Sequence, residues 1–376
     1  MHRWYGVFLR RRGASHSVGA SFFMLRFFAR PEWRVARAVR AFVLLCSAVW
    51  LAAALPVRAE DVKIGVQPIA ASGPFYVAED RGYFAAEGLH VELVTFNASQ
   101  PVAVAVVGGD ITFGATGLTG SLYNFAAQDA VRIIASLHME MPGFQNAGYV
   151  ASNRAYAAGL TSFKDFPGHA ITIGGIGSGP HCALGLLAKK YGFPLTSLRI
   201  LQFPSAAAGM TAVIGGQADL GMPSSTLALP ALRSGEAKLI GWVGDETPCQ
   251  FGAVFTATKT ADTQGDTVQR VLRAYRKGAR DYHDAFTGPD GRRKDEPTAP
   301  DVLAIIARHL GQPATLVRSG IPYVDPEGRV DKADILQQIA WYKEQKFVKG
   351  DIDGARLIDS RYALLVDQNR RPEHSP

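Results

Sequence analysis

The segments AVVGGDITFGATG (105–117) and AVIGGQADLGMPSS (212–225) repeat one pattern. Each begins with Ala-Val, an apolar residue and Gly-Gly, and three residues later an apolar residue and a glycine follow. The Gly-Gly pair predicts the end of a helix, and the residues after it predict a short strand and a turn of small residues. The chain is therefore predicted to contain two copies of one folding unit.

The same order of elements precedes each repeat. Apolar patterning predicts a strand, a helix, a strand and a helix at 62–67, 73–88, 89–96 and 99–109, and again at 170–175, 179–192, 198–203 and 205–216. This alternation predicts mostly parallel sheets with helices on their faces, whose strands all end at the edge where such sheets bind ligands. We predict an α/β protein with two Rossmann-like lobes, a hinge, and a ligand cleft between the lobes.

The glycine-rich turn GGIGSGP (174–180) matches none of the motifs that bind nucleotides or carry a nucleophile. Its third glycine comes one place too early for a dinucleotide site, no Gly-Lys-Ser/Thr follows, and Ile176 occupies the first glycine of a nucleophile elbow. Ser178 and Pro180 fit the start of a helix, whose free amide groups attract polar or anionic ligands. The turn is therefore either an ordinary helix cap or part of a ligand site.

The cleft is expected to be lined by turns rich in Gly, Ser, Thr and Pro, unless the duplicated lobes share no cleft at all. We expect hinges near 148–149 and 242–251. Three amphipathic helices, at 267–286, 299–311 and 332–348, are expected to pack on lobe 1 and complete it.

The first 59 residues have the composition of an export signal. They hold ten of the 40 Lys and Arg residues, one of the 33 acidic residues, and an apolar stretch at 41–55. Residues 60–376 then carry 30 basic and 32 acidic residues, a balance that excludes a polybasic nucleic-acid surface. We expect cleavage after about Ala59 and a periplasmic protein, or, as the alternative, an uncleaved anchor.

The expected organisation follows from these patterns. We place a signal peptide at 1–59 (with Met24 as an alternative start), the first part of lobe 1 at 60–148, lobe 2 at 149–242, the hinge crossover and the C-terminal helices completing lobe 1 at 243–366, and a disordered tail at 367–376.

Four stretches of the chain carry a family resemblance. VKIGVQPIAASGPFYVAEDRGYFAAEGLHVELVTF (62–96), VGGDITFGATG (107–117), HAITIGGIGSGPHCALGLLAKKYGF (169–193) and FPSAAAGMTAVIGGQADLGMPSSTLALPAL (203–232) resemble the nitrate/sulfonate/taurine substrate-binding proteins of ABC importers. The resemblance implies a periplasmic binding protein fold of type II and a monomer that performs no catalysis. Such a protein closes on a small ligand and docks on a membrane permease driven by an ATPase.

The resemblance also implies the binding residues, each of which could instead only make a turn or cap a helix. They are Gln67, Ser72, Gly73, Pro74, Thr116, Gly117, Gly177, Ser178, His181, Ser205, Pro223 and Ser224. Trp242 is added as an aromatic residue near the expected cleft, and Asp245 because it lies near the crossover. Asp245 and its neighbour Glu246 are placed to meet an amine on the ligand. The matched turns contain no Arg or Lys, the usual clamp for an anion.

Other functions stay open at this stage. Phe75, Phe113, Phe144 and Trp242 would suit an aromatic acid or a pyrimidine precursor, or they belong to the core. The same fold family includes thiamine-pyrimidine synthases with a cysteine-rich run, whereas only Cys182 and Cys249 follow the leader here. A sensing partner of a membrane receptor would look the same in sequence. No metal-ligand spacing is present, and we expect no cofactor and no enzymatic activity.

Overall fold

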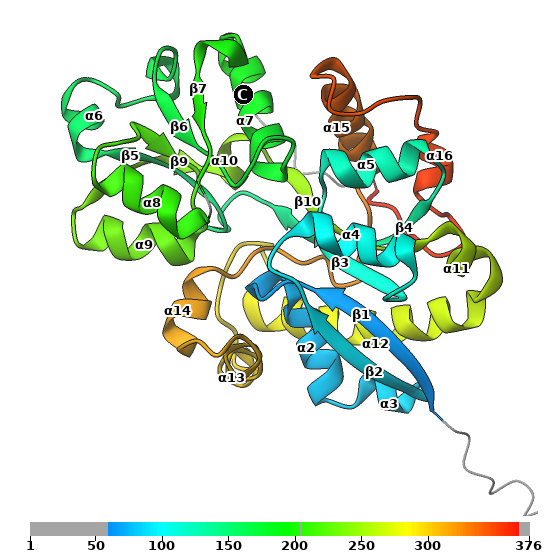
Figure 1. The fold of residues 1–376 in the computed structure, drawn as a ribbon. Coiled ribbons are helices and arrows are strands. Elements are labelled where there is room, and N and C mark those ends of the chain that lie inside the picture. Colours follow the sequence, from blue (N-terminus) through cyan, green and yellow to red (C-terminus); the bar gives the residue numbers. More distant parts are fainter. Residues whose placement is uncertain (1–58, 204, 368–376) are drawn as a thin grey trace, which may run out of the picture. The chain divides into compact units, whose positions relative to one another are not determined.

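A computed structural model describes residues 59–203 and 205–367 (Figure 1). Apart from Ala59 and Asp367, the predicted signal peptide and the predicted tail lie outside these ranges. No helix within the described ranges is both long enough and apolar enough to cross a lipid bilayer.

The first sheet has five strands in the order β2-β1-β3-β10-β4. They are β1 (Glu60–Val66), β2 (Leu89–Thr95), β3 (Phe113–Gly117), β4 (Val131–Glu140) and β10 (Cys249–Ala257). Strand β1 runs parallel to β2 and β3, whereas β10 is antiparallel to both β3 and β4.

The second sheet repeats this plan in the order β7-β6-β8-β5-β9. Its strands are β5 (Gly148–Ser152), β6 (Ala170–Thr172), β7 (Arg199–Leu201), β8 (Leu220–Gly221) and β9 (Ala237–Trp242). Strand β6 is parallel to β7 and β8, and β5 is antiparallel to β8 and β9. In both sheets the first strand of the repeat lies in the middle of the parallel part, which explains the sequence repeat.

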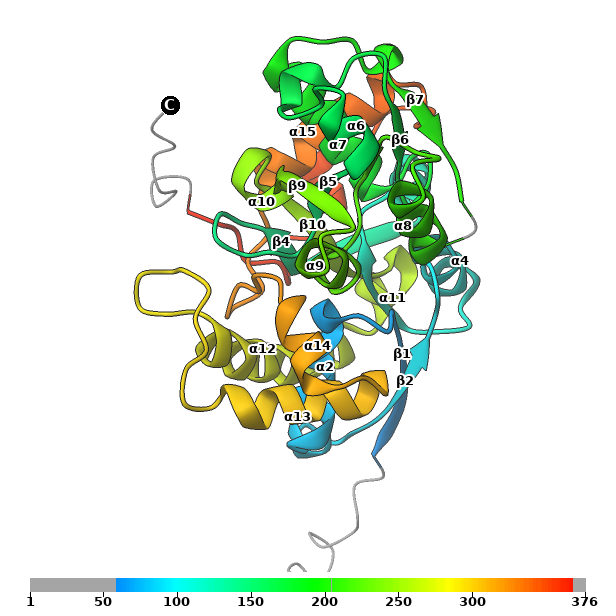
Figure 2. The same cartoon turned by 90° about the vertical axis from the view of Figure 1, so that its left-hand side faces the viewer.

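Helices cover both faces of each sheet (Figures 1 and 2). Those of the first sheet are α2 (Gly73–Asp80), α3 (Tyr83–Ala86), α12 (Gly265–Phe286) and α13 (Ala299–Leu310) on one face, and α4 (Ser99–Gly108), α5 (Gly120–Ala127) and α15 (Lys332–Glu344) on the other. Those of the second sheet are α6 (Asn153–Ala157) and α7 (Gly179–Tyr191) on one face, and α8 (Ala206–Ile214) and α9 (Ser225–Arg233) on the other. The remaining helices are short: α10 (Val243–Glu246), α11 (Thr258–Thr263), α14 (Ala314–Ser319), α16 (Gly354–Leu357), and the 3-10 helices Ala70–Ser72, Phe163–Asp165 and Leu195–Ser197.

The Gly-Gly pairs end helices as predicted. Helix α4 ends at Gly108, and Gly109 takes a left-handed conformation with φ of 84°. Helix α8 ends at Ile214, and Gly216 takes the same conformation with φ of 68°. The sheets are mostly parallel, as predicted: only β10 in the first sheet and β5 in the second run against the other four strands, and both adjoin the segments that carry the chain between the lobes.

Two crossover segments, 141–147 and 243–248, join the sheets and lie against each other. The amide of Gly143 donates to Oδ1 of Asp245 at 2.9 Å, and the amide of Val243 donates to the carbonyl of Ala147 at 2.9 Å. Gly244 has no room for a side chain, since a Cβ atom there would lie 2.4 Å from the carbonyl oxygen of Met141. The two segments therefore form one paired strap between the lobes.

Helix α15 makes a third connection that the sequence did not predict. It follows β10 and packs on the first sheet, but Trp341 also lies directly against Gly185 of α7 in the second lobe. The Tyr342 hydroxyl donates to the carbonyl of Ser178 at 3.0 Å. Helix α7 is thus attached to the first lobe by a buried contact.

We predict that Gly185→Ala destabilises the protein by about 1–3 kcal/mol, because the buried Trp341 ring has to move. A Cβ atom at position 185 would lie 2.2 Å from Nε1 of Trp341. This clash outweighs the gain of about 1 kcal/mol in helix propensity. Urea denaturation measures the change. Gly174→Ala is the control, because nothing lies within 4 Å of its Cβ position; equal stability of the two variants would contradict the α7–α15 contact.

Candidate functional site

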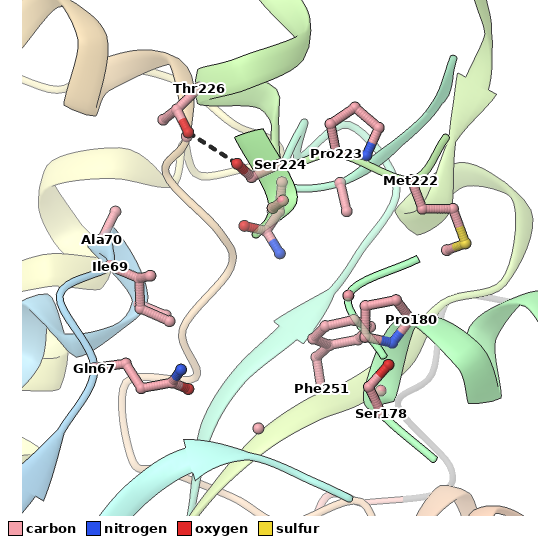
Figure 3. A pocket seen from close by; sticks show the side chains of 18 of the residues that line it. Gln67, Ile69, Ala70, Ser178, Pro180, Met222, Pro223, Ser224, Thr226 and Phe251 are labelled. Atoms are coloured by element: carbon pink, nitrogen blue, oxygen red, sulfur yellow. Dashed lines mark hydrogen bonds between the residues drawn. The ribbon is translucent and has the colours of Figure 1, made fainter. Parts of the chain in front are cut away.

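A cavity of about 380 Å³ lies where the parallel strands of both sheets end. Residues that follow β1, β3, β6 and β8 line it, together with the first residues of α7, α8 and α9 (Figure 3). The carboxyl ends of the strands and the starts of the helices therefore face a common space, as expected for open α/β sheets. The remaining side is lined by four residues from the end of α13 to the end of α14, namely Leu310, Gln312, Val317 and Gly320.

The structure brings several of the residues implied by the resemblance to the cavity wall. Those lining it are Gln67, Gly117, Ser178, Ser205, Pro223 and Ser224. The first two belong to the first lobe and the other four to the second. Their placement agrees with the expected cleft, and their contact with a ligand stays a prediction.

Gln67 follows β1, and its side chain reaches into the cavity (Figure 3). Its Oε1 accepts hydrogen bonds from Thr116 Oγ1 at 2.5 Å and from Ser99 Oγ at 3.1 Å. Two hydroxyl donors fix the orientation of the amide, so its NH₂ group is left to donate elsewhere. Thr116 itself does not line the cavity and orients Gln67 from behind.

The serine hydroxyls on the cavity wall already have protein partners. Ser178 Oγ donates to the carbonyl of Gly175 at 2.6 Å and accepts from the amide of His181 at 3.4 Å. Ser205 caps α8, and Ser224 is hydrogen-bonded to Thr226 at 2.9 Å (Figure 3). The hydroxyl groups of these serines are mainly engaged at the helix starts, which limits their role as ligand-binding groups.

The turn after Gln67 supports the wall from behind. Ser72 Oγ donates to the carbonyl of Gln67 at 2.8 Å, and Ser72 is fully buried. Gly73 and Pro74 begin α2 and face α12: a Cβ atom on Gly73 would lie 2.6 Å from the Tyr282 ring. None of these three turn residues lines the cavity.

The other implied residues lie away from the cavity. Gly177 accepts a hydrogen bond from the amide of Gly120 at 2.9 Å, which ties the glycine-rich turn to the first lobe. His181 is buried against Trp341 and Phe347. Trp242 is the last residue of β9, and Asp245 lies in the crossover strap, where its Oδ1 accepts a hydrogen bond from the amide of Gly143.

Glu246, the second acidic residue of the crossover, is also engaged. It forms an ion pair with Lys190 at 2.8 Å and accepts a hydrogen bond from Tyr191 at 2.8 Å. Phe75, Phe113 and Phe144 are buried and do not line the cavity. Cys182 and Cys249 are both buried and unpaired.

The sequence reasoning missed the hinge-side wall. His138, Asn146 and Phe251 line the cavity there. In the ladder between β10 and β4, Gly252 pairs with His138 and Gln250 with Met139, so Phe251 is an extra residue in a β-bulge. A bulge redirects one side chain, and no sequence pattern marks this one.

The cavity wall carries no formal charge among the described residues. It contains no Asp, Glu, Lys or Arg side chain. His138 lines it, and burial lowers the pKa of this imidazole to about 4, so it is neutral at pH 7. Behind Asn146 lies Glu140, fully buried, whose Oε1 accepts from Asn146 Nδ2 at 2.6 Å. Burial raises the pKa of Glu140 to about 8, so this carboxyl is also mostly neutral.

The family of the chain follows from a match of residues 70–290 to the model described as NMT1/THI5 like. The chain belongs to the NMT1/THI5-like family. A comparison with curated proteins gave no match.

Solved structures of binding proteins share the fold of this family member. The periplasmic aliphatic sulphonate-binding protein SsuA from Escherichia coli has a TM-score of 0.65 at 18% identity, over 84% of this chain and 98% of that one. A ligand-binding component of an ABC-type import system from Staphylococcus aureus, solved with zinc bound, gives 0.62 at 14% identity, over 81% and 98%. The periplasmic nitrate-binding protein NrtA from Synechocystis PCC 6803 gives 0.57 at 12%, over 80% and 85%. The predicted periplasmic binding protein fold is thus confirmed.

We predict that Glu140 makes the protein less stable as the pH rises from about 6.5 to 8. Its pKa is about 8 when folded and 4.5 in the free group, so the folded state holds nearly one proton more at pH 6.5 and about half a proton more at pH 8. The free energy of unfolding should then fall by about 1.4 kcal/mol per pH unit near pH 6.5 and by about half of that near pH 8. Below pH 6.5 the buried histidines act in the opposite direction, because their pKa values are lowered.

Glu140→Gln keeps the hydrogen bond to Asn146 and removes this proton. The difference in unfolding free energy between the two proteins, measured by urea denaturation across the pH range, should therefore grow in favour of the variant. Parallel curves would show that Glu140 is ionised in the folded protein.

Proposed function

We propose that this protein is the solute-binding subunit of an ABC importer. It is exported, the leader is cleaved after about Ala59, and the mature monomer works in the periplasm, where it captures a small polar organic solute and delivers it to a permease and its ATPase. In this proposal lobe 1 comprises 60–148 and 243–366, and lobe 2 comprises 149–242. The observation that carries it is the cavity whose opposite walls come from the two lobes.

Solute binding between the lobes would favour the closed arrangement. The lobes touch across the cavity mouth, where Ser225 Oγ donates to the carbonyl of Ser319 at 2.7 Å and Gly320 lies against Thr226. A solute that contacts both walls gains its full interactions only when the mouth is closed, and it shifts the equilibrium by that difference alone. To shift the ratio of closed to open protein from 1:99 to 99:1, the solute has to bind the closed state more favourably by about 5.5 kcal/mol.

The size and chemistry of the cavity narrow the expected solutes. The family resemblance implies sulfonate, nitrate or taurine, and SsuA and NrtA are named for sulphonate and nitrate. A cavity of about 380 Å³ with apolar walls at Ile69, Met222 and Phe251 suits an organic molecule better than nitrate. Taurine carries an ammonium group, and no carboxylate of the described chain lines the cavity to receive it.

A synthase of the thiamine-pyrimidine type is the competing function within the family. The cavity wall has no cysteine, and Cys182 and Cys249 are buried elsewhere. Burial raises the pKa of the Cys182 and Cys249 thiols, which disfavours the reactive thiolate. These observations favour binding over turnover.

We predict that single changes in either lobe weaken binding of the same solute. Gln67→Ala in lobe 1 and Met222→Ala in lobe 2 should each lower affinity at least tenfold, because both side chains line the cavity. The solute is the one that raises the melting temperature most in a screen of sulfonates, carboxylates and their amides, and calorimetry measures its affinity.

His90→Ala is the control, since His90 is exposed on β2, away from the cavity. Melting curves without solute check that each variant folds. The proposal would be contradicted if only one of the two variants lost affinity, or if mass spectrometry recovered a chemically altered solute.

A further inference from the structure

We infer that the cleft is built for an uncharged solute that carries both an acceptor oxygen and an N–H donor, such as a primary carboxamide or sulfonamide, and not for an anion. The inference rests on the proposed solute-binding function and adds the chemical class of the solute. Two features of the cavity wall carry it: the absence of charge from the described wall, and two amide side chains held in fixed orientations.

An anion in this cavity would lack a cationic partner. The described wall holds no Lys or Arg, whereas Arg233, Arg293 and Arg318 line a different cavity. Moving an ion out of water without a partner costs much free energy, and moving a neutral polar group costs much less. The wall therefore favours neutral solutes unless backbone amides replace the missing cation.

Each helix start at the cavity has one backbone amide that is already used within the protein. In α7 the amide of His181 is held by Ser178, and Pro180 has no N–H. In α8 the amide of Ala208 is held by Ser205 at 3.1 Å. At the start of α9 the amide of Ser225 donates to the carbonyl of Asn146 at 2.8 Å. One donor at each helix start is thus used within the protein, whereas the amides of Gly179, Ala206 and Thr226, which line the cavity, remain for the acceptor oxygen of a solute.

Two amide side chains on the wall, those of Gln67 and Asn146, are oriented by protein partners and have opposite roles. Gln67 accepts two hydroxyl donors at Oε1, so its NH₂ group is presented as a donor. Asn146 spends an N–H on Glu140, so its Oδ1 remains as an acceptor. A sulfonate or carboxylate offers only acceptors and would leave the Asn146 oxygen unpaired, whereas an amide satisfies both side chains.

The remaining wall is suited to the rest of such a molecule. Ile69, Met222 and Phe251 supply apolar surface, and the methionine and the phenylalanine can adapt to an aliphatic or aromatic body (Figure 3). The cavity thus combines hydrogen-bonding amide groups on one part of its wall with apolar side chains on another.

The test uses matched pairs that differ mainly in charge: benzenesulfonamide against benzenesulfonate, and benzamide against benzoate. Calorimetry on the purified protein should show each amide binding at least tenfold more tightly than its acid. Equal or tighter binding of the acids overturns the inference and leaves the solute-binding function intact. Failure of all four compounds to bind also overturns it, and the function is then judged by whether any other solute binds between the lobes.

Variants locate the effect at the oriented amide. Gln67→Glu should lower the affinity for the amides at least tenfold, and Gln217→Glu, the same change at an exposed position, should not. Thr116→Val should also weaken binding because it frees the Gln67 amide to rotate, and Thr116→Ser should restore it. Equal affinities in all four variants would overturn the role given to Gln67.

Discussion

The paired strap formed by 141–147 and 243–248 is the constraint on which the rest of the structure depends. It carries the chain from one sheet to the other and back, and Gly143, Asp245 and Gly244 hold its two segments together. Because each sheet ends its parallel strands on the side facing the other, the strap brings two sets of strand ends and helix starts to one cavity. The lobes also touch at the α7–α15 contact and at the α9–α14 contact, and in the proposed function the α9–α14 contact is the one that opens.

The residues that position the cavity wall differ from the residues that line it. Residues just behind the wall, such as Ser72, Thr116 and Glu140, fix the positions of Gln67 and Asn146. The wall itself is neutral and partly apolar, and burial raises the pKa of Glu140, whose carboxyl is hydrogen-bonded to Asn146 on the wall. A solute would then be selected by shape and by the match of donors to acceptors.

The sequence was informative wherever the signal was local. The Gly-Gly pairs marked two helix ends correctly, and the repeated order of elements predicted the two lobes. Ser178 was recognised as a helix cap, which is the role its hydroxyl has. Gln67 was implied through the family resemblance, but its orientation depends on Ser99 and Thr116, which come from two other elements.

The features that the sequence did not predict depend on contacts between residues far apart in the chain. Phe251 enters the cavity through a bulge, which arises from the register of β10 against β4. The wall at 310–320 follows from the packing of α13 and α14, far along the chain from the other lining residues. The contact of Trp341 with Gly185 of the opposite lobe has no counterpart in local patterning.

The most direct test of this account is a pair of distance measurements by pulsed electron paramagnetic resonance. One pair of labels, at Arg233 in α9 and Thr315 in α14, spans the mouth; the other, at Lys189 in α7 and Glu344 in α15, spans the second attachment. All four positions are exposed. When a solute binds, the distance across the α9–α14 mouth should become shorter and its distribution narrower. The distance between α7 and α15 should not change. An unchanged mouth distance, or a change confined to the α7–α15 pair, would contradict it.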